Sequence, residues 1–563
     1  MSTFLIFFSV LFTTFIPHSL SYPPLVVPLP EHSSDAYETT PPPLGWWTLL
    51  HRSIGISAMH MQLLYDDHVV IFDRTDFGPS NLTLPPDKCH RLDCTAHSVL
   101  YNVVSNTFRP LTILTDTWCS SGSVDPTGRL VQTGGYALGE RVVRTFTPCN
   151  AGPTTTCDWD ELRTTLAARR WYASNHILPD GSVMIVGGRG SPNYEFYPTR
   201  IPRKFPLKFL TETYDGRNRE NNLYPFLHLL PNNHLFVFAN NRSIELDYVT
   251  GKIIREFPIM PSGDKRNYPS TGSSALLPIT VESSLEILIC GGAHPTAFDL
   301  AQIYGVHVAA STTCGRMVIT DPNPRWKMEE MPMPRVMPDM VILPTGDILI
   351  INGAGNGTAG WENADNPVLN PVLYRVKVPD PGRRFLVLNP TEIPRMYHSS
   401  AVLLSNGRVL VGGSNPHRTY NFSRVVKYPT ELSLEGFNPP YMDPRYGPFR
   451  PSILTVETEG KVVNYGQMVG INFVVGEYKG EELGLAVNLI LPPFTTHSNG
   501  MNQRLIVVKK ERVDRLSEDA YKVTVRMPEN VNVAVSGWYM LFVVHAGVPS
   551  HGVWIQLKRS NMV

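Results

Sequence analysis

The chain has 563 residues and a mass of 63.0 kDa, which is enough for several folding units or for one large repeat domain followed by a smaller one. Its 49 Lys and Arg balance its 49 Asp and Glu, so no net charge draws the chain to nucleic acid or to an anionic membrane. Only 17% of residues are charged, and Pro (50) and Gly (42) together make about 16% of the chain. This composition favours a turn-rich, all-β, extracellular protein and argues against a nucleic-acid binder.

The first 21 residues have the pattern of a secretory signal peptide. An apolar run over 4–16 is too short to cross a bilayer as a helix, and it ends at Pro17 and a small-residue pattern. We expect residues 1–21 to be removed, although the start of the chain has no basic residue and an amphipathic or core segment is the alternative. The Pro-rich residues 22–45 are expected to form an extended lead-in.

Four Asn-x-Ser/Thr sequons agree with secretion. No segment after the signal peptide has a transmembrane pattern, so we expect a soluble protein outside the cell with no membrane partner. In a plant, that place is the apoplast or the cell wall, where contact with wall polysaccharide is a further expectation. The expected glycosylation sites are Asn81, Asn241, Asn356 and Asn421.

A hairpin pattern recurs along the first four fifths of the chain: an apolar strand, a tight turn with Asp, Asn or Gly, a second apolar strand, and then small residues, usually Gly-Gly. About seven copies follow one another at a spacing of roughly 45 to 65 residues, which is the size of a propeller blade. Radial stacking of such blades buries both faces of each small sheet. The sequence therefore predicts a seven-bladed β-propeller over 46–440; a solenoid of the same hairpins is the competing fold. The copies lie at 63–71, 124–135, 177–188, 229–236, 275–292, 342–353 and 403–413.

The number of cysteines is seven, which is odd. In an oxidising compartment most should pair, and proximity in the sequence suggests the pairs 89/94, 149/157 and 290/314, although spacing alone does not fix connectivity. Cys119 is then left over. It is an exposed thiol, an intermolecular bridge, a buried inert residue, or a thiol that is used in other covalent chemistry.

The composition changes at a Pro-rich hinge over 437–451, and short alternating apolar runs follow it. Seven such runs in about 110 residues, with no cysteine, predict a small β-sandwich of immunoglobulin-like type over 441–563. The expected strands are 452–456, 469–475, 485–491, 504–508, 521–526, 539–545 and 553–557.

Candidate ligands stand at the start of the repeats. Phrases with a basic residue and a tyrosine open three of them, at 169–174, 265–270 and 394–399. Equivalent positions of different blades face the propeller axis, so Tyr172 and Tyr397 are predicted to approach one central point, with His398 beside the second phenol. His497, in a loop of the C-terminal domain, is predicted to reach the same axis. Two imidazoles with phenolic oxygens suit Cu(II) better than structural Zn.

Chance and scaffold roles are the alternative for each of these residues taken singly. Tyr268, at the same repeat position, is interpreted as scaffold. Only the joint order of the motifs favours a metal site.

The order of four motifs resembles that of the mononuclear copper-radical oxidases, most closely the glyoxal oxidase branch with its plant galactose-oxidase-like members. The motifs are a cysteine at 118–122, a tyrosine at 170–172, a tyrosine-histidine pair at 395–399 and a distant histidine at 496–497. The resemblance covers nearly the whole mature chain and implies a kelch-type propeller followed by a small all-β domain. It further implies one copper ion and a thioether that joins Cys119 to Tyr172.

The resemblance also assigns roles to the remaining ligands. Tyr397 is then the axial ligand and proton acceptor, while His398 and His497 are the imidazole ligands. Oxidation of an aldehyde hydrate removes two electrons, of which copper takes one and a Cys-Tyr radical the other. A released phenolate accepts the proton as a general base, and dioxygen leaves as hydrogen peroxide.

The predicted function is that of a secreted aldehyde oxidase with a small substrate such as glyoxal or methylglyoxal. The galactose-oxidising branch places an indole over the linked tyrosine from a Gly-Gly-x-Trp phrase, whereas 187–190 here reads Gly-Gly-Arg-Gly. Trp118 is an alternative shield, with a plain blade role as its rival. Arg170 and Arg189 are candidates for orienting a carboxylate or carbonyl, with solvated loop charges as the alternative. The rival functions are a primary-alcohol or galactose oxidase acting on wall sugars and a secreted kelch-type binding protein without turnover.

Overall fold

The computed structural model describes residues 43–89, 93–149, 157–280, 284–480 and 484–559. The predicted signal peptide, residues 1–21, and most of the predicted lead-in lie outside these ranges. The described chain is built from β-strands, as the composition predicts, and its α-helices are α1 (Lys208–Glu212) and α2 (Ala297–Tyr304). No helix in the described part of the chain is long and apolar enough to cross a membrane. Short 3-10 turns occur at Pro86–Lys88, Ala137–Gly139, Pro381–Arg383, Pro440–Met442 and Pro444–Phe449.

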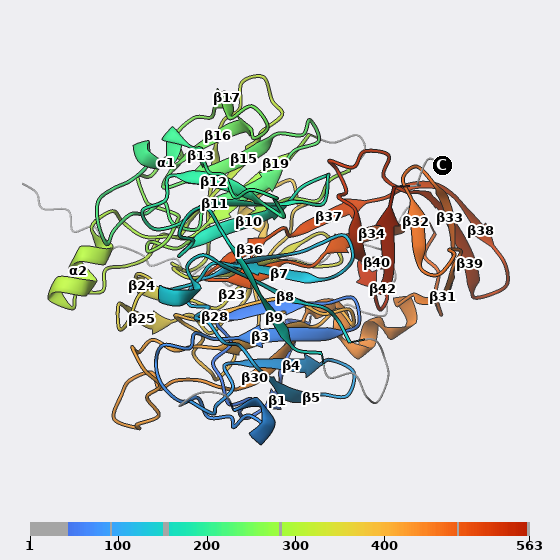
Figure 1. The fold of residues 1–563 in the computed structure, drawn as a ribbon. Helices are drawn as coiled ribbons and strands as arrows, with labels where there is room; N and C mark the ends of the chain where they lie inside the picture. The colour runs from blue at the N-terminus through green and yellow to red at the C-terminus, as the bar shows by residue number, and fades with distance from the viewer. Residues whose placement is uncertain (1–42, 90–92, 150–156, 281–283, 481–483, 560–563) are drawn as a thin grey trace, which may run out of the picture. The chain divides into compact units, whose positions relative to one another are not determined.

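Seven antiparallel four-stranded units form the propeller (Figure 1). The first three blades comprise β2 (His60–Leu63), β3 (His68–Phe72), β4 (Ser98–Asn102) and β5 (Thr107–Leu111); β6 (Ser121–Val124), β7 (Leu130–Thr133), β8 (Val142–Phe146) and β9 (Trp159–Thr165); and β10 (Ala173–Ile177), β11 (Val183–Gly187), β12 (Asn193–Tyr197) and β13 (Phe205–Pro206). The next two comprise β14 (Phe226–Leu229), β15 (Leu235–Ala239), β16 (Arg242–Asp247) and β17 (Lys252–Glu256); and β18 (Ser273–Leu276), β19 (Glu286–Cys290), β20 (Thr313–Val318) and β21 (Lys327–Glu330). Each predicted hairpin copy is the first and second strand of one blade, so the propeller is confirmed and the solenoid is not.

Blade six contains an inserted hairpin, and blade seven closes the ring. Blade six comprises β22 (Asp339–Ile342), β23 (Ile348–Ile351), β26 (Val372–Tyr374) and β27 (Phe385–Val387), and the two-stranded hairpin β24 (Ala354–Gly357) and β25 (Ala364–Pro367) is inserted within it. Blade seven comprises β28 (Ser399–Leu403), β29 (Val409–Gly413) and β30 (Leu434–Asn438), and its outer strand is β1 (Trp46–His51). The ring is therefore closed by pairing the first strand of the chain with the last strand of the propeller.

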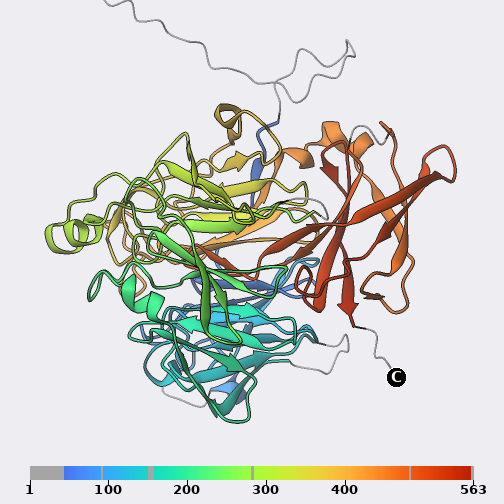
Figure 2. The same ribbon diagram turned by 90° about the horizontal axis from the view of Figure 1, so that it is seen from above.

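Two further sheets form the C-terminal β-sandwich, which is orange to red in Figures 1 and 2. One comprises β31 (Ser452–Val456), β33 (Met468–Val474), β39 (Ala520–Arg526) and β38 (Lys509–Arg515). The other comprises β32 (Val462–Asn464), β42 (Val553–Lys558), β40 (Gly537–His545), β34 (Ala486–Leu491), β37 (Arg504–Val507) and β41 (Val548–Pro549). All seven predicted strands are present to within two residues, and the sequence missed the short or polar β32, β38 and β41.

A hairpin of the C-terminal part enters the propeller. Its strands are β35 (Phe494–Thr496) and β36 (Asn499–Met501), and β35 pairs with β2, so blade one becomes six-stranded. β35 packs against β2, β6 and β28, while β36 packs against β10, β14, β18 and β22. These are the first strands of all seven blades, so the hairpin fills the axis of the ring, where Figure 1 shows β36 among the blades. The turn of this hairpin carries His497.

The buried carboxyl of Asp339 gives the fold a pH dependence. Burial raises the pKa of Asp339 to about 7, and the one hydrogen bond from Asn352, of 2.8 Å, offsets this only in part. Because the folded-state pKa is raised, stability that is present at low pH is lost as the pH rises from about 4 through 7. We expect Asp339→Asn to be more stable than the wild type at pH 8, by on the order of 1–3 kcal/mol, with the difference shrinking towards pH 4.

Urea unfolding at a series of pH values measures this difference. Asp87→Asn, which removes an exposed carboxyl group, is the control and should leave the profile unchanged. A constant difference between Asp339→Asn and wild type across this pH range would contradict the assignment.

Candidate metal centre

Buried arginines fix the turns that present the candidate ligands. Four of them lie ahead of the first strand of a blade, three of them two residues before a central tyrosine, and each donates from Nη1 to a backbone carbonyl at the end of that blade's second strand or one residue beyond it. The pairs are Arg170 with Gly187 (2.6 Å), Arg266 with Gly291 (2.5 Å), Arg335 with Asn352 (2.7 Å) and Arg395 with Gly413 (2.9 Å). Arg170 is fully buried and ion-paired with Glu195 at 2.7 Å, so it positions Tyr172 and does not orient a substrate.

Glycines let neighbouring blades approach near these turns, as the repeat pattern predicts. Gly134 has a φ of +75°, and a Cβ added to it would lie 2.1 Å from the carbonyl oxygen of Arg170. Any other residue would force blades two and three apart.

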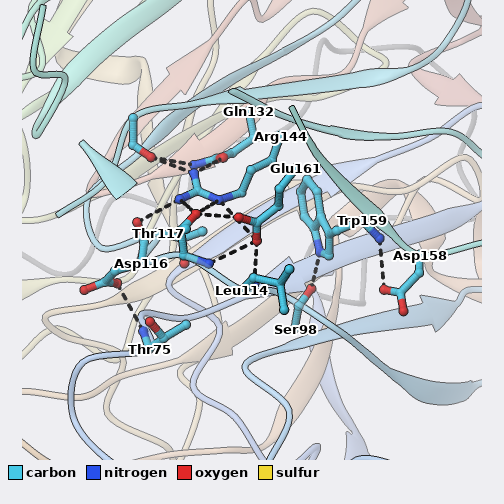
Figure 3. Close-up of polar contacts among 12 residues, drawn as sticks. Thr75, Ser98, Leu114, Asp116, Thr117, Gln132, Arg144, Asp158, Trp159 and Glu161 are labelled. Atoms are coloured by element: carbon cyan, nitrogen blue, oxygen red, sulfur yellow. Dashed lines mark hydrogen bonds and ion pairs between the residues drawn. The ribbon is translucent and has the colours of Figure 1, made fainter. Parts of the chain in front are cut away.

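The turn before Cys119 is held by the buried guanidinium of Arg144 (Figure 3). This side chain donates to Gln132 Oε1 at 2.6 Å, Thr115 Oγ1 at 3.0 Å and the carbonyl of Asp116 at 3.1 Å, and its Nε lies 3.7 Å from Glu161. The carboxylate of Asp116 then accepts from the backbone N–H groups of Thr75 and Trp118. These hydrogen bonds of Arg144 and Asp116 fix the backbone one turn before Cys119.

Cys119 and Tyr172 are neighbours at the starts of blades two and three. The N–H of Tyr172 donates to the carbonyl of Cys119 at 2.9 Å, and the N–H of Tyr224 donates to the carbonyl of Tyr172 at 2.9 Å. Cys119 is a buried free thiol, while the six other cysteines form the three predicted disulfides. Its Sγ lies 3.2 Å from Nε2 of His497.

Four of the five predicted site residues have a left-handed backbone. The φ values are +54° for Cys119, +66° for Tyr172, +63° for His398 and +45° for His497. This conformation is strained for residues with a side chain and tends to gather at functional sites. The hairpin turn and the blade starts hold these four residues there.

The two buried histidines differ in their hydrogen bonds: both ring nitrogens of His497 have a partner, and neither ring nitrogen of His398 does. The Nδ1 of His497 is hydrogen-bonded to Thr496 Oγ1 at 2.7 Å, which turns Nε2 towards Cys119. Neither ring nitrogen of the buried His398 has a hydrogen-bond partner. Burial lowers the pKa of both imidazoles well below the usual range, so both are in the form that binds a metal.

The three side chains converge on one point. Single ligand atoms of Cys119, His398 and His497 all lie within 4.8 Å of one another. A buried histidine without a partner, next to a second imidazole and a sulfur, is the donor set of a soft or borderline metal, and the nearby phenols make it fit copper. The described residues therefore fit the metal that the sequence predicts.

Three phenols form a chain across the centre. Tyr172 Oη donates to Tyr268 Oη at 3.0 Å, and Tyr268 Oη is 2.9 Å from Tyr397 Oη. Burial raises the pKa of Tyr172 and Tyr397 well above the usual range and that of Tyr268 to about 12. Tyr268, interpreted from the sequence as scaffold, thus links the two predicted phenolic ligands.

A cavity of about 810 Å³ opens onto Tyr172, Tyr268 and Tyr397. Among the described residues it is Trp171, not Trp118, whose indole contacts the ring of Tyr172, with centroids 4.9 Å apart. Trp118 lies one ring further away, 5.0 Å from Trp171. The expectation that Trp118 shields Tyr172 is therefore wrong in its choice of indole.

Comparison with known proteins gives the family. The family described as "Glyoxal oxidase N-terminus" matches residues 59–441, and "Galactose oxidase-like, Early set domain" matches 450–557. This chain belongs to the glyoxal oxidase family. "Aldehyde oxidase GLOX" of Vitis pseudoreticulata is 43% identical over 528 residues, covering 91% of this chain and 97% of that protein. "Aldehyde oxidase GLOX1" of Arabidopsis thaliana is 42% identical, covering 91% and 84%.

A solved structure of the same fold supports the architecture. It is titled "Novel fungal alcohol oxidase with catalytic diversity among the AA5 family, in complex with copper", and it superposes with a TM-score of 0.70 at 18% identity. The superposition covers 92% of this chain and all of that one. At this identity the likeness extends to the fold only.

Sequence reasoning missed several residues of this glyoxal oxidase-family site. Arg74, Tyr136 and Trp361 line the cavity from loops with no repeat pattern of their own. Tyr224 stands at the repeat position, and its ring lies 5.2 Å from that of His497. Its place two residues before β14, close to that of Tyr172 one residue before β10, is the signal that would have found it.

Proposed function

We propose that this protein is a secreted copper-radical oxidase that converts small aldehydes to carboxylic acids and reduces dioxygen to hydrogen peroxide. The observation that carries the proposal is the convergence of Cys119, His398 and His497 within 4.8 Å beside the phenols of Tyr172 and Tyr397. Family membership and relatives named aldehyde oxidase support the same conclusion. In balanced form, one aldehyde hydrate and one dioxygen give one carboxylic acid and one hydrogen peroxide.

The residues that would hold copper are His398, His497, Tyr172 and Tyr397. Copper bound there would take one electron from the substrate, and the ring of Tyr172, linked through sulfur to Cys119, would hold the second. The unpartnered nitrogens of His398 support this assignment.

The phenol chain supplies a path for the substrate's proton. We assign Tyr397 Oη as the acceptor, in the phenolate form that it would have when it holds copper, because it lines the cavity and is hydrogen-bonded at 2.9 Å to the phenol of Tyr268. A proton taken up on Tyr397 can be shared with Tyr268, which in turn contacts Tyr172. Burial of all three phenols leaves them in contact with solvent only where the cavity opens onto them.

The surroundings of Tyr172 favour aldehydes over galactose. The guanidinium of Arg189 lies 5.2 Å from the centroid of Tyr172 and 4.7 Å from that of Trp171. The ring of Tyr172 is thus covered by a cation and by the indole of Trp171. A small substrate with a polar carbonyl suits such a wall better than a sugar ring.

We further propose that residues 1–21 direct secretion, that the propeller ends near residue 440, and that glycans are carried at the four sequons. Exposure of Asn81 supports the first of these glycans. At Asn356 the Nδ2 atom, to which a glycan would be attached, donates a hydrogen bond to the carbonyl of His307 at 3.1 Å.

A substrate panel tests the function. The full chain is secreted from a eukaryotic host, loaded with copper and assayed for hydrogen peroxide and oxygen uptake. Glyoxal, methylglyoxal and simple monoaldehydes are compared with galactose and primary alcohols at equal concentration. Turnover of aldehydes in preference to alcohols supports the proposal, turnover of galactose alone favours the wall-sugar oxidase, and no turnover with any of them favours the binding protein.

A further inference from the structure

Arg74 presents unpaired hydrogen-bond donors to the cavity. Its side chain is 2% exposed, and neither Nε nor Nη1 makes a hydrogen bond. Nη2 donates to the carbonyl of Arg418, and Nε lies 3.2 Å from Asp76 Oδ1 in an ion pair without hydrogen-bond alignment. A buried guanidinium with two open donors is costly unless a ligand fills them.

The same cavity wall carries further open donors. The indole nitrogens of Trp118, Trp171 and Trp361 are buried and have no hydrogen-bond partner. Trp118 and Trp361 stack with centroids 5.4 Å apart, and the guanidinium of Arg74 lies over both, 4.5 and 5.2 Å from their centroids. A wall so rich in unpaired donors calls for a ligand that supplies acceptor oxygens.

The carboxylates near Arg74 are occupied elsewhere. Asp73 accepts from the phenol of Tyr420 at 2.6 Å, and Asp116 accepts from two backbone amides. Burial raises the pKa of both carboxyl groups to about 6. Among the carboxylates of the described residues, Asp76 alone pairs with the guanidinium, and it does so at Nε, so the Nη1 edge stays open.

Two other arginines line this cavity: Arg418, whose side chain is exposed, and Arg189, which is already paired. The Nε of Arg189 lies 3.0 Å from Glu220 Oε1 and its Nη2 donates to Glu220 Oε2 at 3.2 Å. Glu220 is buried, so this pair is a persistent one. Arg74 is therefore the better receiver for an anionic group of a ligand.

We propose that Arg74 is a specificity-determining residue that binds a carboxylate oxygen of the substrate and so favours aldehydes that already carry a carboxylate. The proposal rests on the proposed oxidase function and adds a second contact point to the same site. A charged guanidinium pairs with a carboxylate more strongly than with a neutral carbonyl. A dialdehyde gains this contact once its first aldehyde has been oxidised, so its half-oxidised product becomes the better substrate.

Kinetics of Arg74→Gln and Arg74→Lys test the proposal. We expect the KM for glyoxylate to rise at least about tenfold in Arg74→Gln, the loss of one charge-assisted contact, while kcat/KM for the uncharged glycolaldehyde changes less than threefold. Arg74→Lys keeps the charge but not the planar set of donors, so its KM for glyoxylate should lie between those of wild type and Arg74→Gln. Arg242→Gln, which removes a half-buried, ion-paired cation on blade four, should not change the preference.

Binding of oxalate to the full chain after copper removal gives a second readout, through quenching of the cavity tryptophans. We expect wild-type and Arg242→Gln protein to bind alike and Arg74→Gln to bind at least about tenfold more weakly. Equal oxalate affinity in Arg74→Gln and wild type, or an equal loss of kcat/KM for both aldehydes, would overturn the role of Arg74. A wild type that binds oxalate through Arg74 but turns over no aldehyde would refute the oxidase function and leave the carboxylate site standing.

Discussion

Replacing Cys119 by Ser is expected to abolish peroxide production to the background level while leaving the protein folded. The thiol is buried and free, so its loss removes no disulfide, and the serine hydroxyl can still face Nε2 of His497 at the position of Sγ. The cost to stability is about 1–2 kcal/mol for a buried hydroxyl. The variant cannot form the thioether with Tyr172, so the second electron of the substrate has no place to go.

Peptide mapping by mass spectrometry measures the link directly. In the copper-loaded wild type, the peptides with Cys119 and Tyr172 should be joined with the loss of two hydrogens. Tyr224→Phe is a matched control, because that phenol lies in the same cluster but donates to the carbonyl of Ser120. The adduct should persist in Tyr224→Phe and be absent from Cys119→Ser. Full turnover by Cys119→Ser, or a wild type with an unmodified thiol, contradicts the radical assignment.

The blades could be predicted from the sequence because each is a local unit. A hairpin such as 177–188 contains its own turn and an apolar run on each side of it, and these two signals fix β10 and β11 wherever the blade lies. The repeat of the hairpin then fixes the number of blades. The phenols of Tyr172 and Tyr397 follow from the same logic, because equivalent positions of a ring face its axis.

The rest of the site depends on contacts between distant parts of the chain. The sequence predicts that a loop of the C-terminal domain brings His497 to the axis. Nothing in 494–501, however, shows that this segment forms a hairpin that pairs with β2 and contacts all seven blades. Trp361 reaches the cavity from the hairpin inserted in blade six, and Arg74 from the loop after β3. Both side chains contact Trp118, which is more than 40 residues away from each of them in the chain and so beyond the range of any local pattern.

The repeated arginines show how a scaffold residue can be mistaken for a functional one. Arg170 lies two residues from a predicted ligand and carries a charge, which suggests a substrate contact. Its equivalents Arg266, Arg335 and Arg395 make the same bond to the end of a second strand, so the role belongs to the repeat. Arg74 has no equivalent in this series, which agrees with a role in the site.

The second large effect is expected in His398→Ala and His497→Ala, which should each lose at least about 100-fold in copper affinity while remaining folded. Both side chains are buried, and without a metal ion the ring nitrogens of His398 have no partner. Removing His398 therefore leaves no polar group newly unsatisfied, and the loss of packing is offset in part by the loss of a buried unpaired ring. Elemental analysis after dialysis, together with the Cu(II) spin signal, measures the bound metal.

His60 provides the matched control for this prediction. It is a buried imidazole whose ring lies 6.3 Å from that of His497, and its nitrogens are partnered by the carbonyl of Phe72 at 3.2 Å and Ser120 Oγ at 3.3 Å. We expect His60→Ala to lose stability and to keep copper, which is the opposite of His398→Ala. The thermal shift on adding copper separates the two cases, because a metal at 1,000 times its Kd stabilises the folded state by about 4 kcal/mol. Wild type and His60→Ala should both show this shift. If His398→Ala shows it too, His398 is not a copper ligand, and metal binding does not explain why its ring nitrogens have no partner.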